Sequence, residues 1–132
     1  MWEQKQRFSA RSRGFIERYL PMTHRMEAFD LDRLRNERAE WVLKSDYGCE
    51  GDETLVGSFT SDADWRAALE DAVPHRWIVQ RAFTPKLDDS GRNCNLGVYL
   101  IAGATSGMYG RLSVGPTNVT ALSTAIRISE HA

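Results

Sequence analysis

Hydrophobic side chains recur at helical spacing near the start of the chain, which predicts a helix over residues 3–20. The apolar positions of this stretch are Phe8, Phe15, Ile16, Tyr19 and Leu20. Pro21 should end this helix, because a residue that precedes proline avoids the α region. A second, shorter helix is expected to begin after Asp30, a suitable N-cap, and to end near Arg38.

The pattern then changes to short apolar runs that are typical of strands. WVLK (41–44) has β-branched content and ends in turn-forming residues, and ETLVGSF (53–59) is expected to be the strand that leaves that turn. Ser61 resembles the start of a capping box, so a helix should follow it and run to Val73. RWIVQRAF (76–83) is the best candidate for a central strand.

The last third of the chain predicts a polar loop followed by a hairpin. TPKLDDSGRNC (84–94) is the loop, and two strands over residues 95–103 and 107–115 flank a tight Ala-Thr-Ser turn. A last strand is expected at Ala125–Ser129. This order of helices and strands indicates one α+β domain over residues 1–132, with a largely antiparallel sheet.

Composition excludes several classes of protein. The chain has 132 residues, 42% of them hydrophobic and 27% charged, which is ordinary for a globular domain. Its net charge of −1 gives no general attraction to nucleic acid or anionic lipid. No apolar run approaches the ~20 residues that cross a bilayer, and the N-terminus lacks the apolar core of a signal peptide. We therefore expect a cytoplasmic protein without a membrane partner.

The cysteines and histidines do not predict a metal site. Cys49 and Cys94 form no CxxC pair, and no Cys/His cluster has zinc-ligand spacing. We expect both thiols to be free in a reducing compartment. His24, His75 and His131 are scattered singly, as surface or boundary histidines are.

The loop after WVLK carries the strongest hint of chemistry. Gly48 and Gly51 permit backbone conformations that turn amide N–H groups toward an anion, and Lys44 can place an ammonium beside a phosphate. A plain hairpin with a solvent-exposed lysine would show the same spacing. The loop also lacks the Walker A pattern and the dinucleotide-binding fingerprint. Spacing alone thus permits a phosphate site without selecting it.

A family resemblance favours the phosphate site. VLKSDYGCEGDETLVG, the helix around Trp65, WIVQRAF and NLGVYLIAGATSGMYGRLSVG follow one another as in the later part of the circularly permuted ATP-grasp domain. The chain resembles glutathionylspermidine-synthase-like and carboxylate–amine ligase-like proteins. EQKQRF and YLPMT resemble the N-K helix and the Leu-Pro-x-Thr turn upstream of the loop. The resemblance spans roughly Glu3 to Ile128, and it implies a partial ATP-grasp-like domain whose mostly antiparallel sheet has flanking helices.

The resemblance implies that one group of residues binds ATP. Lys44 would contact the phosphates, the loop over residues 47–52 would fold over them, and Lys5 would reach them from the first helix. Gln4 stands where the family usually has asparagine, which weakens the match at Lys5. The implied cofactor-binding residues are Lys5, Lys44, Tyr47, Gly48, Cys49, Glu50, Gly51, Gln80, Arg81 and Ala82.

Two further roles follow from the resemblance. The backbone of Gln80, Arg81 and Ala82 would hydrogen-bond the adenine edge, and Arg111 would be a catalytic residue that faces the transferred phosphate. Each has a simpler alternative. Gln80 could lie on the solvated face of its strand, Arg111 could be a cross-strand charge partner, and Lys5 could belong to a solvated basic helix.

The metal-binding half of such a domain is not visible in the sequence. In the permuted family the Mg²⁺ ligands, an Asp and a Glu-x-Asn pair, precede the N-K helix, and this chain contains no Glu-x-Asn triplet. The resemblance therefore implies the ATP-binding portion of a carboxylate–amine ligase that works through an acyl-phosphate. Its Mg²⁺ ligands are expected mostly outside this chain, and the isolated chain is expected to be inactive.

Two functions of other classes stay open. A non-catalytic module could self-associate as a homo-oligomer or bind a missing half-domain on another chain through exposed apolar surface. Nucleic-acid binding through the arginine-rich first helix is disfavoured by the near-neutral charge and by the lack of an RRM, KH or zinc-finger pattern.

Overall fold

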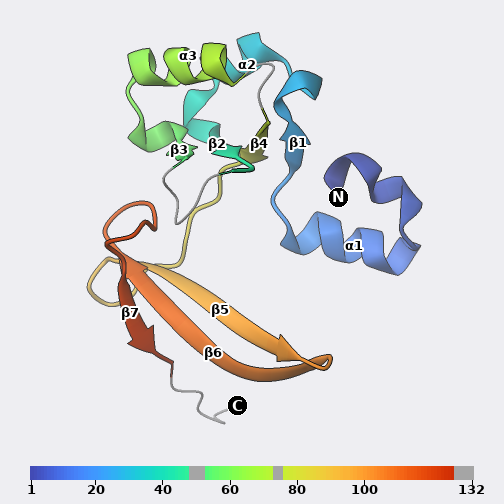
Figure 1. Ribbon diagram of the computed structural model, residues 1–132, viewed down its shortest axis with the longest axis vertical. Helices are drawn as coiled ribbons and strands as arrows, with labels where there is room; N and C mark the ends of the chain where they lie inside the picture. Colours follow the sequence, from blue (N-terminus) through green and yellow to red (C-terminus); the bar gives the residue numbers. More distant parts are fainter. Residues whose placement is uncertain (48–52, 73–75, 127–132) are drawn as a thin grey trace. The chain divides into compact units, whose positions relative to one another are not determined.

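The computed structural model describes residues 1–47, 53–72 and 76–126, and the chain forms two compact units, Met1–Phe83 and Thr84–Ala132. Helices and antiparallel strands are both present, which confirms the α+β class (Figure 1). The sequence predicts one domain over residues 1–132, and the division into two compact units does not test that prediction. No described helix is both long enough and apolar enough to cross a membrane.

The N-terminal helix is divided in two. A 3-10 helix, η1, spans Trp2–Arg7, and the α-helix α1 spans Ala10–Tyr19, so the single helix expected over residues 3–20 is wrong. Ser9 separates them because its side chain accepts a hydrogen bond from a backbone N–H in the first turn of α1. Leu20 is extended, as the proline after it predicts.

The first unit is built around a four-stranded antiparallel sheet in the order β1-β4-β2-β3. Its strands are β1 at Thr23–Arg25, β2 at Trp41–Ser45, β3 at Thr54–Val56 and β4 at Trp77–Arg81. β4 is an interior strand, as its apolar sequence predicts. β1 was not expected from the hydrophobic pattern, because three residues are too few to show alternation.

β3 is shorter than expected, because the chain leaves the sheet at Gly57. A β-carbon on Gly57 would lie 1.9 Å from the carbonyl oxygen of Arg38, so only glycine allows this approach. The Arg38 guanidinium donates hydrogen bonds to the carbonyls of Gly57 and Thr60. Residues Gly57–Phe59 consequently form the 3-10 helix η4, and the expectation of strand over 53–59 is wrong in its second half.

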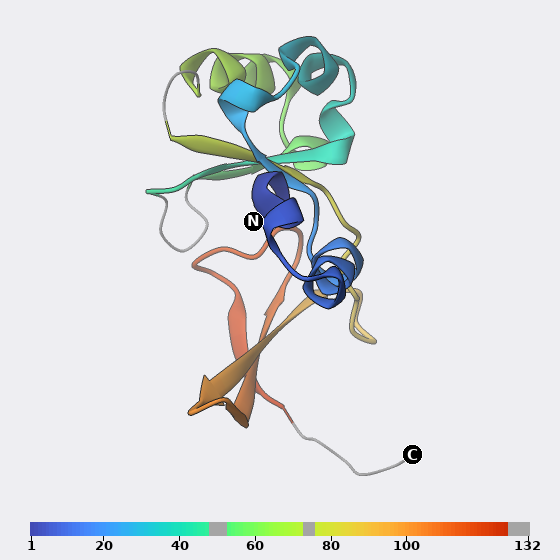
Figure 2. The ribbon, with the colours of Figure 1, turned by 90° about the vertical axis from the view of Figure 1, so that its right-hand side faces the viewer.

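Two α-helices cover one face of this sheet (Figures 1 and 2). They are α2 at Leu31–Asn36 and α3 at Asp62–Asp71, and the 3-10 helices η2 at Met26–Ala28 and η3 at Arg38–Glu40 flank α2. Asp30 and Ser61 cap α2 and α3 as predicted, while α2 ends before Arg38 and the predicted end of α3 at Val73 lies outside the described residues.

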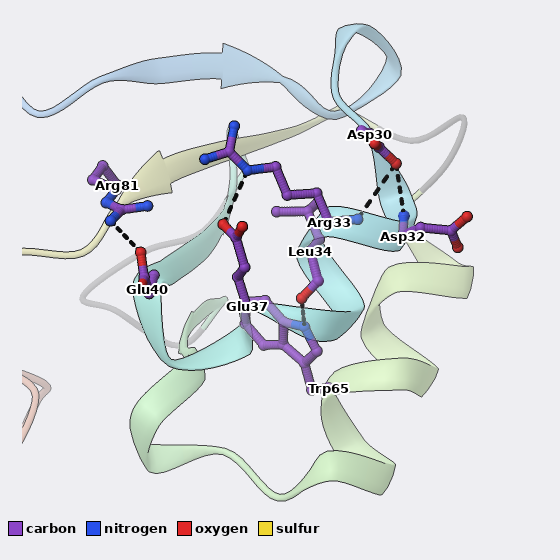
Figure 3. Close-up of polar contacts among 8 residues, drawn as sticks. All are labelled: Asp30, Asp32, Arg33, Leu34, Glu37, Glu40, Trp65 and Arg81. Carbon is purple, nitrogen blue, oxygen red and sulfur yellow. Dashed lines mark hydrogen bonds and ion pairs between the residues drawn. The ribbon is translucent and has the colours of Figure 1, made fainter.

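The core of the first unit lies between these helices and the sheet. Trp65 of α3 is fully buried, and its Nε1 donates to the carbonyl of Leu34 at 3.0 Å, which joins α3 to α2 (Figure 3). The buried cluster consists of Met26, Leu34, Trp41, Leu43, Trp65, Leu69, Ala72 and Val79.

Strand alternation sends a different set of side chains to the other face of the sheet. Leu43 pairs with Val79, and both belong to the buried cluster under the helices. Successive side chains point to opposite faces, so Val42, Lys44 and Gln80 project away from that cluster. This second face carries the candidate site.

The second unit contains a three-stranded antiparallel sheet in the order β5-β6-β7. Its strands are β5 at Asn93–Ile101, β6 at Ala104–Ser113 and β7 at Leu122–Ala125. The hairpin turn lies at Ala102–Gly103 rather than at Ala-Thr-Ser 104–106. Both turn residues have positive φ, 51° and 82°, which matches the twist of a two-residue hairpin. The strand expected at 125–129 instead begins at Leu122, and residues 127–129 lie outside the described residues.

Candidate functional site

Lys44 lies near the end of β2, between Ile78 on β4 and Thr54 on β3. Its side chain is half-buried on the sheet face opposite α2 and α3, and its Nζ donates a hydrogen bond to Oε1 of Gln80 at 2.7 Å. Burial lowers the pKa of the Lys44 ammonium. A desolvated cation is thus held on this face by a neutral amide.

The amide of Gln80 is itself held in one orientation. Thr23 Oγ1 donates its proton to the carbonyl of Pro21 at 2.9 Å, so the hydroxyl is left to accept from Nε2 of Gln80, also at 2.9 Å. Gln80 must then turn its NH₂ toward Thr23 and its oxygen toward Lys44. The direction of the lysine is therefore set through three segments of the chain.

The charge of Lys44 is not matched by a carboxylate in the described part of the chain. None of the ion pairs found there includes this lysine. Burial of a cation without a counter-charge costs free energy, and an anion that reached the ammonium would recover part of it. The site therefore has the electrostatic character of an anion-binding site.

Apolar side chains surround this polar group on the same sheet face. Val42 is the cross-strand neighbour of both Gln80 and Val56, and Ile78 is the neighbour of Lys44. Val42 is itself buried, so the apolar surface that a bound molecule could contact comes from the half-buried Val56 and Ile78. A molecule that combines an anionic group with a small apolar group would find both kinds of surface here.

The entrance to the predicted phosphate loop is fixed by an aromatic and ionic cluster. Arg76 forms an ion pair with Asp46 at 2.6 Å, donates to the Tyr47 hydroxyl at 2.7 Å and lies 4.6 Å from the centroid of its ring. The hydrogen bond to Tyr47 and the charge of Asp46 raise the pKa of Arg76. The negative charge of Asp46, which would repel a phosphate, is thus compensated by Arg76. Gly48, Cys49, Glu50 and Gly51 lie outside the described residues.

The predicted adenine-binding segment already uses its amide groups. The N–H of Arg81 donates to the carbonyl of Met22, and the N–H of Ala82 donates to that of Glu40, both at 2.8 Å. An adenine edge that met this segment without displacing these bonds would therefore use carbonyl oxygens. The Arg81 guanidinium pairs with Glu40 (Figure 3). The same guanidinium lies 5.0 Å from the centroid of the Trp41 ring.

Lys5 and Arg111 have other partners. Lys5 pairs with Glu17 at 2.8 Å, and this hydrogen bond lowers the pKa of Glu17. Arg111 lies on β6 in the second unit, and its guanidinium donates to the carbonyl of Asn118 at 2.6 Å. The structure brings Lys44 and Gln80 together, whereas Lys5 has a carboxylate partner of its own.

Thr23 is the residue of this site that the sequence did not single out. Its strand is too short to be recognised by alternation, and threonine alone indicates no chemistry. The one available signal was its place as the last residue of YLPMT, where the family resemblance put a Leu-Pro-x-Thr turn.

In the part of the chain that the structure describes, no three His, Cys, Asp or Glu side chains gather so that they could hold a metal ion. Comparison of the chain with family models, with curated proteins and with solved structures found no match.

Proposed function

We propose that this chain is the nucleotide-binding portion of an ATP-dependent carboxylate–amine ligase that works through an acyl-phosphate. The observation that carries the proposal is the half-buried ammonium of Lys44, which is held by Gln80 and has no carboxylate partner among the described residues. The sequence segments follow one another in an order that resembles the permuted ATP-grasp domain. This resemblance is the reason to propose a nucleotide as the anion that binds at this site.

In this proposal each residue of the sheet face has a physical task. Lys44 places its charge against phosphate oxygens, where negative charge develops as a phosphoryl group moves to a carboxylate. Gln80 and Thr23 hold the ammonium in position before the nucleotide arrives, which reduces the ordering that binding requires. The half-buried Val56 and Ile78 offer apolar surface to the base, beside the buried Val42.

The proposed activity is divided between this chain and residues outside it. When ATP is bound, Mg²⁺ would neutralise negative charge on the phosphates, and the carboxylates that would hold it are expected outside this chain. The isolated chain would therefore bind ATP weakly and would not form an amide bond by itself.

Calorimetric titration of the chain with Mg-ATP tests the proposal. Lys44→Ala should weaken binding by about tenfold or more, because it removes a charge-assisted contact to phosphate. Lys86→Ala is the matched control, since Lys86 is an exposed lysine of the 84–92 loop. Equal affinities of Lys44→Ala and the wild type would overturn the phosphate role, and so would a wild-type chain that binds no ATP.

A second variant tests the arrangement that holds the lysine. Thr23→Val removes the acceptor of the Gln80 NH₂ group but leaves Lys44 in place. We expect it to weaken ATP binding by about threefold, less than Lys44→Ala does. Thr105→Val, at an exposed position of β6, should leave the affinity unchanged. An affinity of Thr23→Val equal to that of the wild type would show that orientation of the amide does not matter.

A further inference from the structure

Within the second unit, no described helix or further sheet packs on the sheet β5-β6-β7. In its described residues, only Gly110 and Ser113 are buried. The exposed large side chains of its three strands are Leu96, Val98, Tyr99, Leu100, Ile101, Tyr109 and Leu122. A sheet gains stability from a second layer packed on one face, and the described residues of the second unit by themselves provide no such layer.

β5 is the long edge of this sheet. One side of β5 pairs with β6, and the other side is the outer edge. Near the start of β5 this outer edge is covered, because the N–H of Cys94 donates to the carbonyl of Lys86 and Asn93 forms a bridge with Leu87. Peptide groups alternate between the two sides of a strand, so the next ones that point outward belong to Leu96, Val98 and Leu100. No described strand pairs with them.

The sequence of β5 does not protect this edge. Exposed edge strands usually carry charges or proline, or are very short, which prevents pairing with another chain. β5 is nine residues long, and its sequence NCNLGVYLI contains neither a charged residue nor proline. The edge strands of the first unit, β1 and β3, have three residues each, and the other edge of this sheet, β7, has four.

We propose that β5 pairs antiparallel with β5 of a second copy of this chain. A two-fold axis at Val98 places Val98 against its own copy and Leu96 against Leu100 of the second copy, and these are the residues whose peptide groups point outward. The side chains of Leu96, Val98 and Leu100 lie on one face of the sheet. In the dimer this apolar row would lie beside the same row of the second copy and form one continuous apolar surface. A neutral strand that faces itself brings no like charges together, which favours a second copy over a charged partner. This pairing does not depend on nucleotide binding.

Sedimentation velocity of the full chain over a wide concentration range tests the pairing. The wild type should form a dimer with increasing concentration, and Val98→Lys should raise the dissociation constant by about tenfold or more, because two charges would meet at the axis. Val114→Lys is the matched control, since Val114 is 90% exposed and lies outside the strands. A wild type that stays monomeric would overturn the proposal, and so would equal dimerisation of wild type and Val98→Lys.

Hydrogen exchange of the wild type gives a readout that does not depend on the folding of a variant. The amides of Leu96, Val98 and Leu100 should exchange more slowly as concentration rises. Those of Asn95 and Gly97, which point toward β6, should change little. A dimer that forms without protection of the three outward amides would refute pairing through β5 and would indicate packing through another surface.

Discussion

At the scale of single residues, Lys44 shows a conflict between stability and the proposed binding role. Its ammonium is half-buried, and burial lowers its pKa below the ordinary value of 10.5. In the described part of the chain Gln80 supplies a hydrogen bond but no opposite charge. The position therefore costs the folded state free energy at neutral pH, which is the pattern expected of a residue kept for binding rather than for stability.

Replacement of this lysine by an apolar side chain of similar length should reveal that cost. In the wild type the unfolded chain binds more protons in the alkaline range between the lowered pKa and pH 10.5, so the free energy of unfolding rises with pH there. Lys44→Met should have an equal or higher melting temperature at pH 7 and should lack this alkaline rise.

Melting temperatures recorded from pH 7 to about pH 11 check the prediction. Lys86→Met, at an exposed lysine, serves as the control and should follow the wild type. A large drop in the melting temperature of Lys44→Met at pH 7 would instead show that Lys44 stabilises the folded state.

At the scale of elements, the hairpin of the second unit depends on a turn whose sequence is not optimal. Ala102 adopts φ 51°, a left-handed conformation that alanine tolerates poorly, while Gly103 at φ 82° suits its position. The turn was expected two residues later, at Ala-Thr-Ser, between strands over residues 95–103 and 107–115. Strand pairing sets the position of the turn, because Ile101 pairs with Ala104 and only two residues are left between the strands.

Ala102→Asn should therefore stabilise the hairpin. Asparagine accepts the left-handed conformation better than alanine, and Asn-Gly is a favoured two-residue turn, so a gain of about 0.5 kcal/mol in the free energy of unfolding is expected. Gly103→Ala should cost about 1 kcal/mol, because it places a β-carbon at positive φ. Urea denaturation followed by the circular dichroism of the sheet measures both changes, and a destabilised Ala102→Asn would contradict the conformation of this turn.

At the scale of the whole molecule, the two units differ in the size of their cores. All eight members of the buried cluster belong to the first unit, whereas the second unit buries only Gly110 and Ser113 among its described residues. Hydrophobic burial supplies most of the free energy of folding, so the first unit should be the more stable of the two.

The distribution of aromatic residues makes this difference measurable. The four tryptophans, Trp2, Trp41, Trp65 and Trp77, all lie in the first unit, so tryptophan fluorescence reports on it alone. At low protein concentration we expect far-ultraviolet circular dichroism to begin its change at lower urea than tryptophan fluorescence. Coincident transitions by the two probes would show that the units unfold as one.

The sequence by itself determined the features that depend on neighbouring residues. Asp30 and Ser61 cap helices because a short polar side chain reaches backbone N–H groups two or three residues ahead. β2 and β4 follow from runs of apolar and β-branched residues, and the α+β class follows from the order of such pieces. Lys44 could be selected as the entrance to a loop, but its partners could not.

Only the tertiary structure decided what lies far apart along the chain. Gln80 and Thr23 are 57 residues apart in sequence, and the hydrogen bond between them depends on the register of β1 against β4. Gly57 ends β3 because the carbonyl of Arg38 approaches it, and no local pattern announces that contact. The candidate site is therefore a product of strand pairing: the sequence supplied the lysine, and the sheet supplied the amide and the hydroxyl that hold it.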